Sequence, residues 1–326
     1  MVTIPGVSIK KAADVRDVHI DGPLSSISTA YMQDQTDFVS GRVFPVVPVE
    51  KQSDKYFTWP KDTFFRNRAD KWIPGTLMKS SQFDMDTADY LAEFRAFEHP
   101  LRWDIRDNAD AALNLERAPI EYVTRMILLN REVEWAAAYM VTGVWGTDST
   151  GGTGFTQWSD YDASDPIADF RTARLKIKKN TGYTPNTAVI AQEVFEVLAD
   201  HPLIKELYKY TAPAILTPEL VARALRVDRL FIAGGIKLDS AEGAANTFDW
   251  IFAKRAWLGY VNPRPALMAA SAGYIFSWRG FTQGYEVGIE RIPDRRVKAD
   301  YTQGFSAYAL KVVASDLGYL FDSAVA

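Results

Sequence analysis

The sequence predicts an α+β protein in which a compact body carries a long extended arm. Three observations carry this prediction. Residues 114–141 have the length and apolar spacing of one long helix. From residue 185 to about residue 291, short strand-like and helix-like segments alternate. Residues 42–68 are rich in proline, valine and aromatic side chains and have no helical period, which favours an extended path.

The longest predicted helix has the sequence NLERAPIEYVTRMILLNREVEWAAAYMV. Pro119 suits its first turn, and Gly143 is a natural stop. At 1.5 Å per residue its length is roughly 40 Å, which is enough to brace a whole domain. A second helix is expected where Asp165 can cap the start and Gly182 the end.

A long β-hairpin is predicted between the proline-rich stretch and the first helix. The sequence DKYFTW alternates as a strand, and Phe83, Met85 and Thr87 alternate with aspartates in a second arm. A polar, cationic tip joins the two arms. Because a two-stranded hairpin alone is marginal in water, it needs a partner surface from this chain or from another one.

The composition excludes several classes of protein. The chain has 326 residues, and 13% of them are aromatic, which favours large packed surfaces or interfaces. The net charge of -4 argues against nucleic-acid binding by overall electrostatics. A basic patch on one face is compatible with that charge. The absence of cysteine excludes disulfides, thiolate metal sites and cysteine nucleophiles. No apolar run has the length of a membrane span, and the start lacks the order of a signal peptide. A cytosolic origin and no membrane partner are therefore expected.

The sequence contains no recognisable catalytic or metal-binding motif. The histidines His19, His99 and His201 are isolated, without the paired spacing of a metal site. The glycine-rich run STGGTG lacks the Gly-Lys-Ser/Thr of a phosphate loop. We therefore predict no catalytic residue, no metal site and no cofactor.

One alternative for chemistry stays open at this stage. Asp84, Asp86 and Asp89 are close enough in sequence to supply a glycosidase-like acid pair. Strand alternation places Asp84 and Asp86 on a solvent face, which favours an ordinary surface role.

Two cationic stretches are candidates for binding. At the hairpin tip, Phe64, Phe65 and Trp72 are poor choices for a solvent-facing loop, so the cations among them serve either solubility or docking on an acidic neighbour. Those cations are Lys61, Arg66, Arg68, Lys71 and Lys79. The later run RIPDRRVKADY is either a surface turn or a patch that faces nucleic acid, because Arg and Lys suit phosphate contact. Its cations are Arg291, Arg295, Arg296 and Lys298.

The order of these features resembles the major capsid proteins of tailed bacteriophages, which have the Hong Kong 97-type fold. An arm leads into an extended two-armed loop, a long bracing helix, an α/β unit and a returning strand. The amino-acid sequence itself resembles that of one subfamily of these proteins over nearly the full chain. The stretches that carry the resemblance are LSSISTAYMQDQTDFVSGRVFPVVPVEKQSDKYFTW, REVEWAAAYMVTGVW, DPIADFRTARLKIKKNTGYTPNTAVIAQEVFEVLADHP and LFDSAV.

The resemblance implies four parts of the chain. They are an N-terminal arm (1–52), an extended-loop hairpin (53–94), a peripheral domain (95–184 and 292–326) with its spine helix (114–141), and an axial domain (185–291). The arm and the hairpin would lie on neighbouring subunits. The short arm from Met1 indicates a separate scaffolding protein or none. The lysine–asparagine cross-link of some members is not predicted here.

The resemblance also implies a function. The chain would be a structural protein and not an enzyme, self-assembling into hexamers and pentamers of an icosahedral shell that encloses phage double-stranded DNA. Its partners would be copies of itself, the packaged DNA and portal, scaffolding or decoration proteins. It would be located in the virion after assembly in the host cytoplasm. The alternatives are a nanocompartment shell of the same fold and an α/β hydrolase with a carboxylate pair. Residues expected at contacts between subunits are Phe44, Phe57, Trp59, Phe64, Phe65, Arg66, Arg68, Trp72, Glu121 and Glu132.

Overall fold

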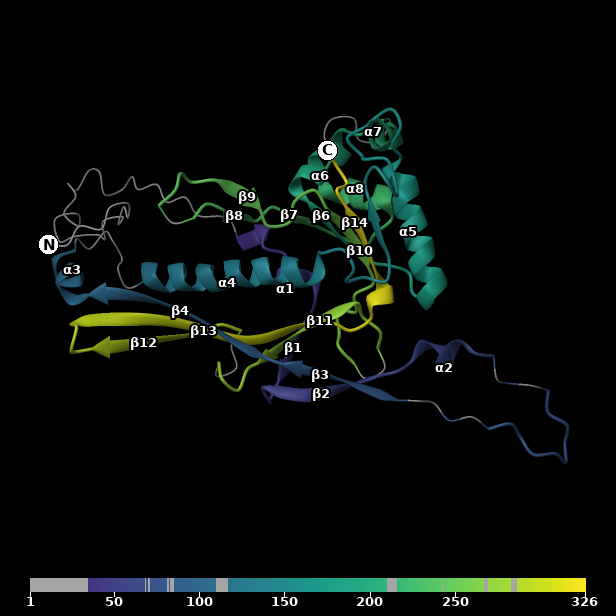
Figure 1. Cartoon of the computed structure of the whole chain (residues 1–326), viewed down its shortest axis with the longest axis horizontal. Helices are drawn as coiled ribbons and strands as arrows, with labels where there is room; N and C mark the ends of the chain where they lie inside the picture. Colours follow the sequence, from purple (N-terminus) through teal and green to yellow (C-terminus); the bar gives the residue numbers. More distant parts are fainter. Residues whose placement is uncertain are drawn as a thin grey trace.

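The protein is known from a computed structural model, in which two sheets, one long helix and a projecting hairpin form the main features (Figure 1). The structure describes residues 35–67, 69, 71–80, 82, 85–109, 117–209, 216–241, 243–266, 269–282 and 286–326. The greater part of the predicted N-terminal arm lies outside these residues. Among the described helices, none has the length and hydropathy needed to cross a membrane.

The first sheet is built from strands that are distant in sequence. Its order is β1-β11-β13-β12, and the fifth strand, β4, also pairs with β13. Its longest strand is β13, which runs antiparallel to β4, β11 and β12. The strands are β1 (Val46–Val49), β4 (Glu93–Arg102), β11 (Gly273–Trp278), β12 (Gly288–Asp294) and β13 (Ala299–Val312).

The long helix α4 (Ala118–Tyr139) lies along one face of this sheet (Figure 1). A proline stands in its first turn, as the sequence predicts, and the prediction of one long helix is confirmed. Gly304 lets the helix approach β13 closely, because a Cβ there would lie only 2.3 Å from Cγ1 of Val123 and 2.7 Å from Cδ1 of Ile127. The helix and the sheet therefore form one tightly packed layer pair.

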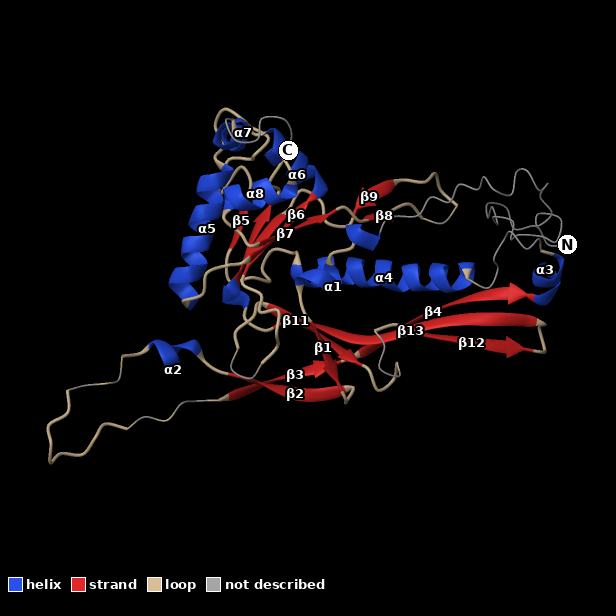
Figure 2. Ribbon diagram, turned by 180° about the vertical axis from the view of Figure 1, so that it is seen from behind, coloured by secondary structure: helices blue, strands red, loops and turns tan. Residues whose placement is uncertain are grey.

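The second sheet has the order β5-β14-β10-β6-β7. Helices lie around it (Figure 2). Its strands are β5 (Asp148–Thr150), β6 (Thr187–Ala191), β7 (Arg229–Ala233), β10 (Ala256–Gly259) and β14 (Gly318–Asp322), and the helices are α5 (Pro166–Thr181), α6 (Gln192–Asp200), α7 (Pro202–Tyr208) and α8 (Pro218–Leu225).

The start and the end of α5 follow the predicted capping residues. The Asp165 carboxylate accepts a hydrogen bond from the Ala168 backbone N–H at 2.9 Å, which satisfies one of the free amides of the first turn. Gly182 adopts a left-handed conformation, φ 78°, and its N–H bonds to Lys178 O. The second predicted helix is thereby confirmed together with both of its caps.

An aromatic cluster joins the two sheets. Phe44, directly after α1 (Ser40–Val43), lies 4.5 Å from the ring of Tyr139 and 5.4 Å from the ring of Trp257, between ring centroids. The Phe44 side chain is 0% exposed within its own chain. The expectation that Phe44 contacts another subunit is therefore wrong, because this ring belongs to the core that holds α4 against the second sheet.

The hairpin consists of β2 (Ser53–Thr58) and β3 (Asp86–Leu91), paired antiparallel. Its base lies on the first sheet, where the ring of Tyr90 stacks on Phe276 at 4.7 Å and the ring of Tyr56 lies 5.4 Å from Phe276. The rest projects away from the body (Figure 1). Where a long polar tip was expected, the first turn after β2 is a short helix, α2 (Lys61–Phe65).

Smaller elements complete the chain. The strands β8 (Ile236–Leu238) and β9 (Phe248–Trp250) pair in a separate hairpin, whereas residues 251–255, expected as part of one strand, form bends. Short helices are α3 (Trp103–Asn108), η2 (Gln35–Asp37) and η4 (Ser315–Leu317).

The sheets divide the chain differently from the predicted domain boundaries. The predicted peripheral domain, which contains α4, also includes β5, α5 and β14. In the structure, β5 and β14 are strands of the second sheet, and α5 packs on that sheet. Conversely, β11 and most of β12 lie within the predicted axial range, yet both strands belong to the first sheet. The reason is strand pairing between distant segments, which local sequence does not display.

Candidate functional site

Exposed apolar side chains gather on the hairpin and on the strand that follows it. Leu77, in the loop between the two hairpin strands, is 99% exposed, and Phe65 is 63% exposed. Such a run of exposed apolar surface marks an interaction site. The exposed large apolar residues of this segment are Phe57, Phe64, Phe65, Trp72, Ile73, Leu77, Met78, Met85, Leu91, Phe94 and Phe97.

The predicted contact residues on the hairpin are mostly open to solvent. Phe57, Phe64, Phe65 and Trp72 are exposed, as is Arg66, while Trp59 is half-buried. Arg68 lies outside the described residues. The structure therefore brings Phe57, Trp59, Phe64 and Phe65 together around α2 and leaves Trp72 further out on the loop.

A groove of about 500 Å³ opens where α2 returns toward the body. Aromatic rings of the hairpin line one wall, and Tyr183 and Leu317 line the other. Lys61 forms an ion pair with Asp316 across it. The ring of Phe65 lies over Gly182, where a Cβ would be 3.4 Å from the ring. These contacts hold the root of the loop against its own chain.

The two glutamates predicted at subunit contacts lie in different surroundings. Glu121 is half-buried on the first turns of α4 and pairs with Arg117 at 2.6 Å. Glu132 is only 2% exposed, and its two carboxylate oxygens accept hydrogen bonds from the backbone N–H groups of Val39 and Ser40 at 3.0 and 2.9 Å. The expectation for Glu132 is therefore wrong, since its partners belong to the same chain.

The surroundings of Glu132 make it an internal anchor. Burial raises the pKa of its carboxyl group, although the hydrogen bonds from the two amides act in the opposite direction. Together these contacts fix α1 to α4.

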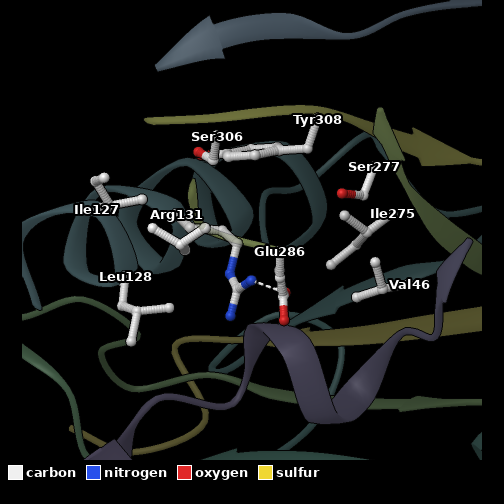
Figure 3. A pocket seen from close by; sticks show the side chains of 10 residues that line it. Val46, Ile127, Leu128, Arg131, Ile275, Ser277, Glu286, Ser306 and Tyr308 are labelled. Carbon is white, nitrogen blue, oxygen red and sulfur yellow. Dashed lines mark hydrogen bonds and ion pairs between the residues drawn. The ribbon is translucent and has the colours of Figure 1, made fainter. Parts of the chain in front are cut away.

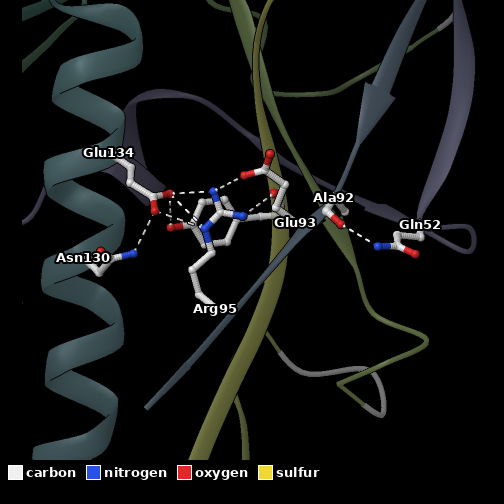
Figure 4. A network of polar contacts seen from close by, with 7 residues as sticks. Gln52, Ala92, Glu93, Arg95, Asn130 and Glu134 are labelled. Atoms are coloured by element: carbon white, nitrogen blue, oxygen red, sulfur yellow. Dashed lines mark hydrogen bonds and ion pairs between the residues drawn. The ribbon is translucent and has the colours of Figure 1, made fainter.

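A polar network links β4, α4 and β13 (Figure 4). The Arg95 guanidinium donates to both oxygens of Glu134 at 3.1 and 3.0 Å, and the Tyr308 hydroxyl donates to Glu134 at 2.8 Å. Burial pushes the pKa of Glu134 upward, but the hydrogen bonds from Arg95, Tyr308 and Asn130 outweigh it and lower that pKa. This network fixes the position of α4 along β4 and β13.

A small cavity lies between α4 and the first sheet (Figure 3). Its volume is about 10 Å³, and an ion pair between Arg131 and Glu286 stands at its side. A space of this size holds at most one water molecule. It is therefore a packing defect and offers no room for a substrate.

The second predicted cationic patch lies at one end of the first sheet. Arg291 stands in β12, whereas Arg295, Arg296 and Lys298 lie in or beside the turn to β13, and all four are exposed. Arg296 is paired with Asp294 at 2.9 Å. This end of the molecule lies opposite the hairpin tip (Figure 1).

The acid pair weighed as a catalytic alternative does not form among the described residues. Asp86 and Asp89 are both exposed on β3, and an odd spacing along a strand directs them to opposite faces. Asp84 and His19 lie outside the described residues. His201 is buried and its ring contacts Ser164 Oγ at 3.0 Å, while His99 packs edge-on against Tyr122. Within the described ranges, no three His, Cys, Asp or Glu side chains converge as metal ligands.

Comparisons with known proteins find similarity to phage major capsid proteins. A family model described as phage major capsid protein E matches residues 143–258. The curated major capsid protein of Burkholderia phage BcepMu is 23% identical over 223 residues, which cover 68% of this chain and 71% of the relative.

Solved structures show a shared fold. A phage-related protein from Bordetella bronchiseptica RB50 superposes with a TM-score of 0.69 at 22% identity, over 90% of this chain and 94% of that one. The capsid structure of Cyanophage P-SCSP1u superposes with a TM-score of 0.59 at 10% identity, over 98% of both chains. At this low sequence identity, the structural likeness shows the fold alone. The similarity to phage major capsid proteins comes from the family model and from the Burkholderia phage protein.

Proposed function

Because the chain is a phage major capsid protein with the Hong Kong 97-type fold, we propose that its copies close into an icosahedral shell of hexamers and pentamers around the double-stranded DNA of the phage. It belongs to a structural protein family and is located in the virion. Portal, scaffolding and decoration proteins are further partners of such a shell, and assembly takes place in the host cytoplasm.

The exposed hairpin is the observation that best supports self-assembly. Its apolar side chains are concentrated on one projecting loop, whose root is tied to its own body by the contacts around α2. Beyond α2 the loop projects away from the body, so its apolar side chains there cannot be buried against their own chain. Their burial requires another molecule, and contact surfaces of this aromatic kind dominate the energy of obligate interfaces.

We divide the subunit by its sheets. The peripheral domain consists of the first sheet with α4, and the axial domain consists of the second sheet with α5 to α8. The strand β14 joins the axial domain in this division. The hairpin extends from the peripheral domain and reaches a neighbouring subunit.

The cationic end of the first sheet is the proposed DNA-facing patch. Its exposed Arg295 and Lys298 can contact phosphates without reading bases. Replacing both with glutamine should leave empty shells intact and lower the salt concentration at which packaged DNA is lost from purified particles. An unchanged salt profile would remove this patch from the DNA interface.

The test of assembly uses the hairpin aromatics. Replacing Phe64, Phe65 and Trp72 with serine should leave the circular dichroism spectrum unchanged and abolish particles in electron micrographs and in the void volume of a sizing column. Leu175→Ser is the matched control, because Leu175 is a similarly exposed apolar residue (61%) that belongs to α5 and not to the hairpin.

Two results would overturn the proposal. A wild-type chain that stays monomeric under all assembly conditions contradicts a shell, and a triple variant that unfolds shows that the rings serve the monomer core. Virions that hold protein cargo without DNA would instead identify a nanocompartment.

A further inference from the structure

His201 stands at the junction between α6 and α7, where the first helix ends and the second begins. Of the histidines that the structure describes, it alone is fully buried, with 0% of its side chain exposed. Histidine is the side chain whose ordinary pKa lies close to neutral pH. A buried histidine between two helices is therefore a place where a change of pH can act on the fold.

Two hydrogen bonds show which ring nitrogen of His201 carries the proton. Nδ1 accepts the backbone N–H of Leu203 at 3.3 Å, so Nδ1 itself is unprotonated. Nε2 lies 3.0 Å from Ser164 Oγ, and that hydroxyl donates its hydrogen to the carbonyl oxygen of Asp160. The hydroxyl can therefore only accept from the ring, and Nε2 carries the hydrogen. The ring is neutral in this arrangement.

The ring joins the start of α7 to the turn before α5. Leu203 supplies one of the free N–H groups in the first turn of α7, and the His201 carbonyl oxygen accepts from the next two, Ile204 and Lys205. Ser164 directly precedes Asp165, which caps α5. The helices α5, α6 and α7 lie together at the end of the molecule that carries the C-terminus (Figure 2).

Protonation of the ring removes one of these two contacts. The added proton must bind Nδ1, because Nε2 already carries one. The contact with Ser164 survives, since Nε2 donates in both forms. The contact with Leu203 is lost, because two N–H donors then face each other, and a charged ring remains in a buried place.

The charged groups around the ring do not offset this cost. Asp165 raises the pKa of His201, but burial acts more strongly and lowers that pKa below its ordinary value of 6.5. Asp200 and Lys205 pair with each other at 2.9 Å. The titratable and charged groups on the elements packed around the ring are Asp160, Tyr161, Asp162 and Asp165 before α5, Asp169 and Arg171 on α5, Asp200 on α6, and Lys205 and Glu206 on α7.

The short helix α7 is suited to opening on its own. It has seven residues, and Ile204 is the one among them that is buried. Leu203 and Leu207 are 38% and 56% exposed. At its far end, the Tyr208 hydroxyl donates to the Leu220 carbonyl oxygen at 2.8 Å. With so few buried contacts, the cap at the start of α7 decides how firmly the helix is held.

We propose that His201 is an acid-sensitive clasp, which holds the first turn of α7 at neutral pH and releases it when the ring is protonated. Because folding lowers the pKa of His201, the closed arrangement is most stable above about pH 6.5 and weakens as pH falls through that value. Release also changes the molecular surface. The groove of about 310 Å³ between α5 and α7, lined by Ile167 and Leu203, exists only while α7 is held.

Hydrogen exchange measured by mass spectrometry tests the clasp on the full-length protein. Exchange of peptides that cover residues 202–209 is followed from about pH 7.5 to about pH 5.5 and corrected for the exchange of an unstructured peptide at each pH. Corrected exchange should rise by up to about tenfold for each pH unit below 6.5, as the uptake of one proton requires. Peptides from the buried strand β6 are the internal reference and should show no such rise.

His201→Asn is the informative variant, because asparagine keeps an acceptor for the Leu203 N–H and does not titrate. Its α7 should stay protected at pH 7.5 and lose the pH dependence. His99→Asn is the matched control, since His99 is a half-buried histidine on β4, and α7 should respond to pH as in the wild type. Asp169, whose pKa burial raises, is present in both variants, so the comparison separates it from His201.

Nuclear magnetic resonance of protein labelled with ¹⁵N-histidine provides a second measurement in case His201→Asn fails to fold. The chain has only three histidines, so the spectrum is simple. One ring should carry its hydrogen on Nε2 at neutral pH and titrate below pH 6.5. Corrected exchange of α7 that stays flat down to pH 5.5 overturns the clasp. So does an equal pH dependence in His201→Asn, or a spectrum in which every ring titrates at or above 6.5.

Discussion

The removal of one acceptor from the buried Glu132 carboxylate tests the internal anchor of α1. Each oxygen of Glu132 accepts one backbone N–H, from Val39 at 3.0 Å and from Ser40 at 2.9 Å, and both amides are buried. In Glu132→Gln, one oxygen becomes an amino group that can only donate. One buried amide then lacks an acceptor, which costs about 1–3 kcal/mol. The smaller desolvation cost of a neutral side chain offsets part of this loss.

We therefore expect Glu132→Gln to lower the free energy of unfolding by about 2 kcal/mol and Glu132→Ala by about 4 kcal/mol, since alanine leaves both amides without an acceptor. Urea titration followed by tryptophan fluorescence measures both values, and limited proteolysis should cut faster near α1 in both variants. Glu196→Gln is the control, because Glu196 is exposed on α6. A Glu132→Gln chain within about 0.5 kcal/mol of wild type would refute the reasoning.

Three further predictions concern the body of the subunit. Gly304→Ala should lower stability by about 1–3 kcal/mol in urea titration, because the added methyl group overlaps Val123 and Ile127 on α4. Glu134→Gln should cost more stability near pH 7 than near pH 3: the folded-state pKa of Glu134 is lowered by its hydrogen-bond donors against the effect of burial, so its contribution is present at neutral pH and is lost as pH falls through that pKa. Gly182→Ala should cost about 1 kcal/mol in thermal unfolding, because φ 78° disfavours a side chain.

Local sequence predicted the helices well because their determinants are local. The start of α5 follows from an aspartate and a proline in adjacent positions, and its end follows from Gly182. The pairing of the strands into sheets could not be predicted from local sequence. Whether β11 pairs with β13 or with β10 depends on contacts between segments far apart, and the predicted domain boundaries differ from the sheets for that reason.

The contact residues show the same limit on a finer scale. Phe44 and Phe57 belong to the same extended, aromatic stretch, and nothing in their neighbours distinguishes them. One is fully buried because Trp257, more than 200 positions away, closes over it, and the other is 50% exposed. Glu132 likewise has the helical spacing of a surface acid, and its partners are backbone amides, which no sequence pattern shows.

The contacts among the rings of Phe94, Trp278, Phe281 and Phe305 carried no signal in the sequence. Phe94 and Phe305 stand more than 200 positions apart and approach each other only because β4 and β13 pair. Glu98 and Glu290 likewise come to stand on either side of Gln303 only because both strands pair with β13.

The place of β14 in the second sheet has a consequence for the order of synthesis. This strand lies between β5 and β10, and the residues just after it, Ala324 and Val325, are buried. The second sheet therefore stays incomplete on the ribosome until residues 318–325 have emerged, whereas the hairpin at 53–91 emerges early. The exposed apolar side chains of the hairpin are thus present on the nascent chain before the second sheet can close. On a polysome, where many nascent chains lie close together, these exposed apolar hairpins are brought near one another before any chain has completed its second sheet.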